Sequence, residues 1–246
     1  MQIRAIRTRI FKEREDLLAF IRGHIPRLKK GSVLAVASKI VALAEGRVVE
    51  AKGKRQKATL IQKESEWVLQ THKEWWWTEK GGALLVNAGI DDSNAAGKLI
   101  LLPKDSFKAA AQLREQLRWL YKVKSLGIVI TDSRIVPMRK GVTGLALGYA
   151  GFRGVRDYRG KPDIFGRKLK VTMTDVADSL ATAATLVMGE GAERQPLAVI
   201  EGAPVEFVDG FDKLTARKKE VQISAKDDMY APLFKRVGKS KKVPRE

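Results

Sequence analysis

Residues 126–133, with the sequence LGIVITDS, form the stretch that decides the fold. Residues 126–130 are apolar apart from one glycine, and such a short β-branched run bounded by polar residues predicts a buried strand. Thr131, Asp132 and Ser133 follow directly, so polar side chains emerge just past the predicted strand end. Sheet proteins commonly carry their ligand-binding groups at this position. The stretch therefore predicts a buried sheet and the place of its chemistry.

Further strands and helices are predicted on both sides of this stretch. Aliphatic runs predict strands at residues 32–37, 99–102 and 196–200. Helical spacing and capping residues predict helices at residues 13–29, 106–121 and 174–188. Residues 141–167 are rich in Gly and Arg, which predicts a long loop or ribbon, and long segments of this kind in compact domains are usually functional.

The composition describes a globular chain. It has 246 residues with 44% hydrophobic and 30% charged residues, enough to bury a core as one large domain or two interlocked smaller ones. We expect one domain over residues 1–234 and a basic, disordered tail over residues 235–246. No apolar run is long enough to cross a bilayer and no leader pattern opens the chain, so we expect a soluble, cytoplasmic protein. The absence of cysteine means that any metal must be held by oxygen ligands.

The chain is strongly basic, with 47 Lys and Arg against 28 Asp and Glu and a net charge of +19. This charge favours phosphorylated or polyanionic partners, although it also suits an ordinary solvated surface. The common RNA- and DNA-binding motifs are absent. The cluster Trp75, Trp76 and Trp77 suits packing or an interface better than base stacking, since three adjacent indoles cannot all point inward.

Several acidic residues stand at the ends of predicted elements. They are Asp91, Asp132, Glu190 and, in the Gly/Arg-rich segment, Asp157 or Asp163. Carboxylates at such positions suit a hard divalent cation that is shared with phosphate. The alternative is capping and turn formation, for which Asp and Gly are equally good. The common nucleotide-binding and hydrolase motifs are absent.

Seven motifs in a fixed order carry a family resemblance. They are SKIVALAEGRVVE (38–50), NAGIDDSN (87–94), GIVITDS (127–133), PMRKGVTGLALGYAGF (137–152), DYRGKPDIFGRKLKVT (157–172), VADSLATAATLVMGEG (176–191) and PLAVIEG (196–202). From the N-terminus to about Phe207 the chain resembles the gamma-glutamyl ligase family typified by coenzyme F(420)-0:L-glutamate ligase. It is especially similar to the bacterial branch labelled as folate-metabolism gamma-glutamate ligases.

The resemblance implies an α+β fold with mixed sheets and helices, assembled as an intertwined homodimer with the site near the dimer interface. It also implies an amide ligase that phosphorylates an acceptor carboxylate from GTP, after which the α-amine of L-glutamate attacks the acyl phosphate. Two divalent cations, Mn²⁺ or Mg²⁺, and K⁺ would assist. The acceptor would be coenzyme F(420)-0 or a related, folate-like molecule.

The resemblance also implies roles for individual residues. The expected metal ligands are Asp91, Asp132, Ser133 and Glu190. The expected GTP-binding residues are Ser38, Lys39, Asn94, Met188, Gly189, Glu190, Gly191 and Gln195. Arg159 and Arg167 are predicted as catalytic residues that hold an acceptor carboxylate or phosphate. The alternative for both arginines is a structural ribbon held by salt bridges.

Three departures from the family pattern concern the pocket. Leu43 stands where the family has a second lysine, residues 80–82 read Lys-Gly-Gly instead of Arg-His-Gly, and residues 8–11 replace a Gly-Leu-Pro nucleotide loop. These departures favour a related acceptor over the deazaflavin itself. A competing hypothesis is a basic nucleic-acid-binding protein that has kept the fold without catalysis.

Overall fold

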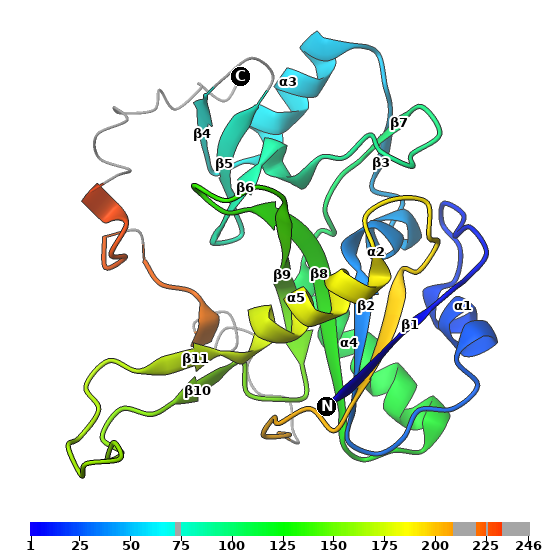
Figure 1. The fold of residues 1–246 in the computed structure, drawn as a ribbon. Helices are drawn as coiled ribbons and strands as arrows, with labels where there is room; N and C mark the ends of the chain where they lie inside the picture. Colours follow the sequence, from blue (N-terminus) through cyan, green and yellow to red (C-terminus); the bar gives the residue numbers. More distant parts are fainter. Residues whose placement is uncertain (72–74, 209–219, 225, 233–246) are drawn as a thin grey trace.

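The protein is described from a computed structural model. The described residues are 1–71, 75–208, 220–224 and 226–232. The predicted basic tail, residues 235–246, lies outside them. In the part of the chain that is described, helices and mixed sheets combine in one architecture, which confirms the α+β class (Figure 1).

A five-stranded sheet forms the centre, in the order β1-β12-β2-β8-β9. Its strands are β1 (Gln2–Ile6), β12 (Leu197–Glu201), β2 (Ser32–Ala37), β8 (Leu126–Ile135) and β9 (Val142–Ala150). Strands β2 and β8 run parallel, and the other neighbours are antiparallel. The strands predicted at 32–37 and 196–200 are therefore confirmed, the second shifted by one residue.

Strand β8 is longer than the sequence predicted, which corrects the position of its polar residues. Thr131, Asp132 and Ser133 lie inside the strand and not past its end. Pairing with β9 continues to Ile135 after a register shift between Ile130 and Thr131. Pairing with β2 stops at Thr131, so the polar side chains emerge where β8 loses one of its neighbours.

The predicted loop over residues 141–167 is half wrong, because its first part is the buried strand β9. The glycines that suggested a loop serve close packing instead. A Cβ at Gly144 would lie 2.5 Å from the backbone of Ala181, and one at Gly148 would lie 2.3 Å from the backbone of Ser106. The ribbon does form further along, where β10 (Val155–Asp157) pairs with β11 (Met173–Asp175) and projects from the body (Figure 1).

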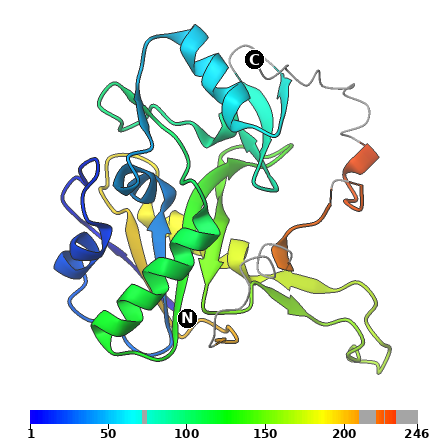
Figure 2. The same ribbon diagram turned by 180° about the vertical axis from the view of Figure 1, so that it is seen from behind.

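Helices cover both faces of the central sheet. Helices α1 (Leu17–His24), α2 (Ser38–Ala44) and α4 (Ser106–Tyr121) pack on one face, and α5 (Val176–Met188) packs on the other (Figures 1 and 2). Side chains of β2 alternate accordingly, with Leu34 and Val36 in the first core and Val33 and Ala35 in the second. Because β2 is buried on both of its faces, its sequence is a continuous apolar run without alternating polar residues.

Capping residues fix the helix starts. Asp16, Asp105 and Asp175 each accept a hydrogen bond from a backbone N–H of the first turn. The predicted helix over residues 13–29 is consequently confined to α1, while the other two predicted helices match α4 and α5 closely. No helix in the described ranges combines the length and apolar character needed to cross a bilayer.

A second layer lies beside the carboxyl end of β2. It contains β3 (Val48–Glu50) paired with β7 (Lys98–Ile100), helix α3 (Lys54–Glu64), the 3₁₀ turn η1 (Asn87–Gly89), and a three-stranded sheet. The strands of that sheet are β4 (Trp67–Gln70), β5 (Trp76–Lys80) and β6 (Ala83–Val86). Trp76 packs against the small core of this layer, as predicted for the tryptophan cluster, whereas Trp75 is 54% exposed.

Candidate active site

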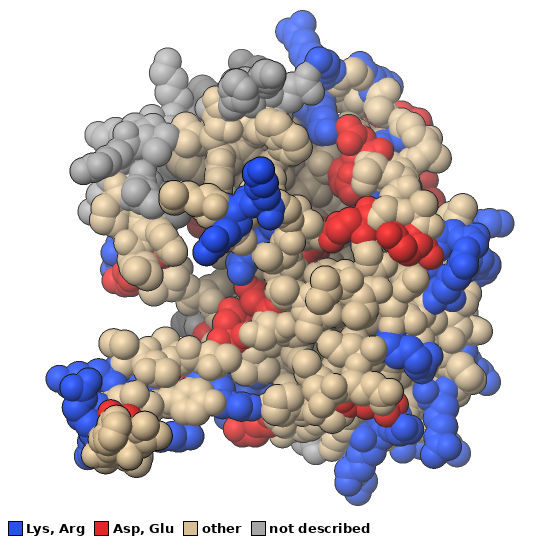
Figure 3. Space-filling view, viewed as in Figure 1, with Lys and Arg blue, Asp and Glu red and all other residues tan. Residues whose placement is uncertain are grey.

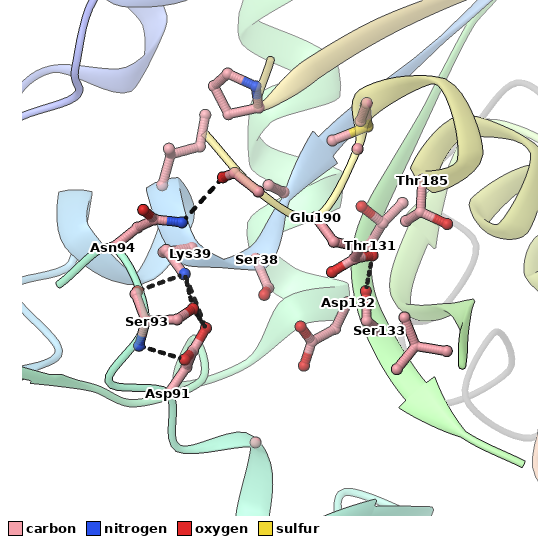
Figure 4. A pocket seen from close by; sticks show the side chains of 18 of the residues that line it. Ser38, Lys39, Asp91, Ser93, Asn94, Thr131, Asp132, Ser133, Thr185 and Glu190 are labelled. Atoms are coloured by element: carbon pink, nitrogen blue, oxygen red, sulfur yellow. Dashed lines mark hydrogen bonds and ion pairs between the residues drawn. The ribbon is translucent and has the colours of Figure 1, made fainter. Parts of the chain in front are cut away.

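A pocket of about 800 Å³ lies where β2 ends and the second layer meets the central sheet. Its size falls within the range of ligand-binding pockets. The residues predicted from the sequence that line it are Ser38, Lys39, Asp91, Asn94, Asp132, Ser133, Met188, Gly189, Glu190, Gly191 and Gln195. Figure 4 shows the polar members of this set facing one another from four separate segments. The fold thus brings together every predicted metal-binding and GTP-binding residue.

Asp91 is positioned by an unusual turn. Asn87, Ala88 and Gly89 all have positive φ angles, of 53°, 55° and 68°. A Cβ at Gly89 would lie 2.6 Å from the side chain of Leu102, so glycine is required by space as well as by conformation. The amide of Asp91 then donates to the carbonyl of Ile100 at 3.0 Å, which fixes the aspartate backbone at the edge of the pocket.

The Asp91 carboxylate has a cationic partner already. Lys39 Nζ lies 2.8 Å from Asp91 Oδ2 and also donates to the Ser93 carbonyl at 2.9 Å. The amide and hydroxyl of Ser93 donate to the same carboxylate at 2.7 and 2.9 Å. Burial acts to raise the pKa of Asp91, but the ion pair with Lys39 and the hydrogen bonds from Ser93 outweigh it, and the pKa is lowered.

Asp132 is in the opposite electrostatic situation. Burial raises the pKa of Asp132 to about 7, and the negative charge of Asp91 acts in the same direction. Hydrogen bonds from the Ser133 amide and the Ser38 side chain, and the more distant charge of Lys39, oppose this only in part. Asp132 forms no ion pair within the described residues. A cation bound in the pocket would supply the missing counter-charge.

Glu190 and Asn94 connect the remaining segments. Ser133 Oγ donates to Glu190 Oε1 at 2.6 Å, which joins β8 to the loop after α5. Asn94 Nδ2 donates to the Gly191 carbonyl at 3.1 Å, so the Asp91 segment reaches the same loop. Helix α5 is itself held on the sheet by Asp178, which pairs with Arg134 at 2.9 Å.

The four predicted metal ligands have the oxygen atoms that a metal ion needs, but their side chains do not converge on one point. Carboxylate and hydroxyl oxygens are the ligands that Mg²⁺ and Mn²⁺ prefer. However, no group of three or more acidic or imidazole side chains in the described part of the chain is close enough to hold a metal ion. Asp91 contacts Lys39, Glu190 contacts Ser133, and Figure 4 draws Asp132 between them. In chemistry, though not in arrangement, the donor set fits a hard cation.

Arg159 and Arg167 are not part of this pocket. Both lie on the ribbon that β10 and β11 begin, and Arg159 Nη2 is 2.6 Å from Asp157 Oδ2. The pKa of Asp157 is lowered to about 2 by this hydrogen-bonded arginine. The amide of Arg167 donates to Asp163 Oδ1 at 2.8 Å, within a turn. Asp163 therefore serves the turn role that was the alternative to metal binding, and Asp157 pairs with Arg159 as in the salt-bridged ribbon that was the alternative for the arginines.

Of the three departures from the family pattern, two concern the pocket directly. Leu43 and residues 8–11 line it, and the Thr8 amide donates to the Arg194 carbonyl at 2.8 Å. Residues 80–82 do not line it, and Lys80 pairs with Glu64 at 2.5 Å instead.

Sequence reasoning missed several residues of the pocket. They are Trp75, Thr185 and Arg134, whereas Arg9 and Arg194 fall within segments, residues 8–11 and 188–195, that the family resemblance placed around the nucleotide. Thr185 could have been found, because it lies one helical turn before Met188 on the same face. The others reach the pocket from segments without a recognisable motif. The pocket lining therefore carries charges of both signs, with Arg9, Lys39, Arg134 and Arg194 set against Asp91, Asp132, Glu190 and Glu193.

On one face of the molecule the charged side chains form no continuous basic patch (Figure 3). On the face that Figure 3 shows, Lys and Arg side chains stand mostly around the outline, and acidic side chains gather nearer the middle. A nucleic-acid-binding surface usually presents a continuous basic patch. This face therefore offers no specific support for the nucleic-acid hypothesis.

The chain is similar to known proteins of one described family. The profile of a family described as F420-0:Gamma-glutamyl ligase matches residues 5–202. A protein of Methanopyrus kandleri named Coenzyme F420:L-glutamate ligase is 36% identical over 210 residues, covering 78% of this chain and 83% of the relative. Proteins of the same name are 41% identical in Methanococcus maripaludis, over 58% of each chain, and 33% identical in Methanocaldococcus jannaschii, over 87% of this chain and 92% of the relative.

Proposed function

Since this chain belongs to the F420-0:gamma-glutamyl ligase family, a family of ligases, we propose that it joins L-glutamate to an acceptor carboxylate with GTP as the energy source. The acceptor is coenzyme F420-0 or a related, folate-like molecule. The observation that carries the proposal is the convergence of Ser38, Lys39, Asp91, Asn94, Asp132, Ser133 and the loop after α5 on one pocket.

The proposed reaction has two steps. An oxygen of the acceptor carboxylate attacks the γ-phosphorus of GTP, the bond to the β-phosphate oxygen breaks, and GDP leaves. The α-amine of L-glutamate then attacks the carbonyl carbon of the acyl phosphate, inorganic phosphate leaves, and the nitrogen loses a proton to give the amide. Neither step needs a protein nucleophile, in agreement with a pocket that contains no cysteine.

The chain's own cations would bind the triphosphate. Lys39 Nζ is held at the pocket wall by Asp91 and Ser93, and Arg9 and Arg194 line the same cavity. Positive groups fixed before the substrate arrives stabilise the charge that moves in phosphoryl transfer. Asn94 and Gly191, joined by their hydrogen bond, would close the loop after α5 over the nucleotide.

The residues proposed to hold two divalent cations, Mn²⁺ or Mg²⁺, are Asp91, Asp132, Ser133 and Glu190. Such cations, when bound, neutralise phosphate oxygens and polarise the transferred group. The raised pKa of Asp132, which has no ion-pair partner in the described ranges, supports this assignment because a cation would relieve the cost of its charge. K⁺ is proposed as an additional monovalent activator.

We also propose that the active form is a homodimer. Arg159 and Arg167 lie on a ribbon outside the pocket of their own chain, so a catalytic role for them requires that the ribbon reach a second copy. In that case the arginines would hold a carboxylate or phosphate in the neighbouring pocket.

The proposal is tested by following both products. Protein is incubated with GTP, Mn²⁺, K⁺, L-glutamate and coenzyme F420-0 or a reduced folate, and GDP release and the mass of the acceptor are measured. A gain of one glutamate residue on the acceptor, with stoichiometric GDP and no reaction when any component is omitted, is expected. GTP hydrolysis without glutamylation of either acceptor would contradict the ligase assignment.

A further inference from the structure

Trp75 presents a half-exposed indole at the wall of the pocket. Its carbonyl accepts hydrogen bonds from the amide and hydroxyl of Thr71, at 3.1 and 2.9 Å. The next amide, of Trp76, donates to Asn87 Oδ1 at 3.0 Å. The backbone is therefore anchored on both sides, yet Trp75 is 54% exposed while lining the cavity. An aromatic ring that lines a cavity on an anchored backbone and stays half exposed is suited to contact a ligand.

Other apolar side chains line the same cavity. Ile135 and Val142 are paired across β8 and β9, and they are 41% and 46% exposed. Leu85 of β6 also lines the pocket and packs with Leu145 of β9, which brings the second layer against this end of the sheet. Exposed apolar surface rimmed by polar groups marks a binding site more often than a chance feature.

The order of the strands separates this apolar end from the other end of the pocket. Residues 8–11 follow β1 and Arg194 precedes β12, at one side of the sheet, whereas Ile135 and Val142 lie at the opposite side on β8 and β9. Asp132 on β8 and Ser38 after β2 lie between these two ends. A nucleotide held by residues 8–11 and the loop after α5 would thus leave the apolar end of the pocket free for the acceptor.

We propose that Trp75, with Leu85, Ile135 and Val142, forms the acceptor subsite and binds the planar heteroaromatic ring of the acceptor by stacking on the indole. The inference rests on the proposed ligase function and adds to it the side chains that hold the ring of the acceptor. L-glutamate is small and polar, so contact with these apolar side chains would contribute little to its binding. A ring bound at the apolar end can extend a carboxylate toward Asp132, where the phosphoryl group would be transferred.

Binding without turnover gives the direct test. The affinity of coenzyme F420-0 and of folic acid is measured by fluorescence titration, in the absence of GTP and metal, for the wild type and for Trp75→Ala. Stacking of a ring on an aromatic side chain predicts a rise of about 10- to 100-fold in Kd for the bound acceptor. Trp75→Phe, which keeps an aromatic face, should stay within about threefold of the wild type. Trp119→Ala is the matched control, because Trp119 is 83% exposed on α4 and does not line the pocket.

Steady-state kinetics separates this role from a structural one. The KM for the acceptor should rise in Trp75→Ala while the KM values for GTP and L-glutamate stay the same. An acceptor Kd that changes less than twofold in a folded Trp75→Ala would overturn the inference, as would a loss confined to GTP, which would assign the indole to the guanine base. If Trp75→Ala fails to fold, Trp75→Leu and Trp75→Phe decide, since only the second should bind normally. A wild type that binds neither acceptor also overturns the inference, whereas binding without glutamylation overturns the proposed function alone.

Discussion

Replacing Asp132 by asparagine is expected to stop GTP turnover and, at the same time, to stabilise the ligand-free protein above neutral pH. Asparagine has nearly the same shape as aspartate and can still accept the hydrogen bond from the Ser133 amide. It cannot carry the negative charge that a bound divalent cation requires. The strand that carries it, β8, is buried before this position and should be unaffected.

The size of the stability effect follows from the pKa of Asp132. The pKa is raised from 3.8 to about 7 in the folded protein, so the folded state holds the proton more tightly than the unfolded chain. Stability is therefore lost as the pH rises from 3.8 to about 7, and the loss persists at higher pH. A rise of about three pH units in a pKa corresponds to about 4 kcal/mol of unfolding free energy, an upper limit because Asp132 retains some contact with solvent.

Thermal and chemical unfolding at pH 5 and pH 8, in the presence of a chelator, measure this effect. Asp132→Asn should exceed the wild type in stability at pH 8 and by less at pH 5. Added Mn²⁺ should raise the melting temperature of the wild type at pH 8 and leave that of the variant unchanged. Asp92→Asn is the matched control, because Asp92 lies in the same motif as Asp91, pairs with Lys57 and does not line the pocket.

Two results would refute the reasoning. Undiminished Mn²⁺-dependent turnover by Asp132→Asn would remove Asp132 from the metal site. A variant less stable than the wild type at pH 8 without metal would show that the buried charge is not costly.

Four further outcomes are expected. If the ribbon reaches the pocket of a second copy as proposed, Arg159→Lys should raise the KM for the acceptor by about tenfold, because lysine lacks the planar fork of arginine; an unchanged KM would leave Arg159 with the structural pairing to Asp157 alone. Gly144→Ala should lower the unfolding free energy by about 2 kcal/mol or more in denaturant titrations, because its Cβ would lie 2.5 Å from the backbone of Ala181, and an unchanged midpoint would contradict that packing. In a competition between coenzyme F420-0 and reduced folates for labelled L-glutamate, the departures from the family pattern taken together predict preference for the folate-like acceptor, and exclusive glutamylation of the deazaflavin would refute it. Purified protein should carry no absorbance at 260 nm that high salt removes, whereas salt-strippable nucleic acid would revive the nucleic-acid hypothesis.

The sequence by itself determined β2, β12 and the first half of β8, together with the chemical types in the site. The apolar runs at residues 32–37 and 126–130 predict β2 and the first half of β8, because burial on both faces leaves a clear local pattern. Ordered motifs supplied Asp91, Asp132 and Glu190, all of which line the pocket. These features are local, and local patterns can be read without knowing the fold.

Only the tertiary structure decided which side chains meet. Asn94 and Gly191 are 97 residues apart and form one hydrogen bond, and Ser133 and Glu190 are 57 residues apart and form another. The glycines of β9 suggest a loop until α5 is seen packed against Gly144. Similarly, Trp75 reaches the pocket only because the second layer packs on β8 and β9. Contacts of this kind depend on strand pairing and layer packing across the whole chain, and no periodicity in a single segment encodes them.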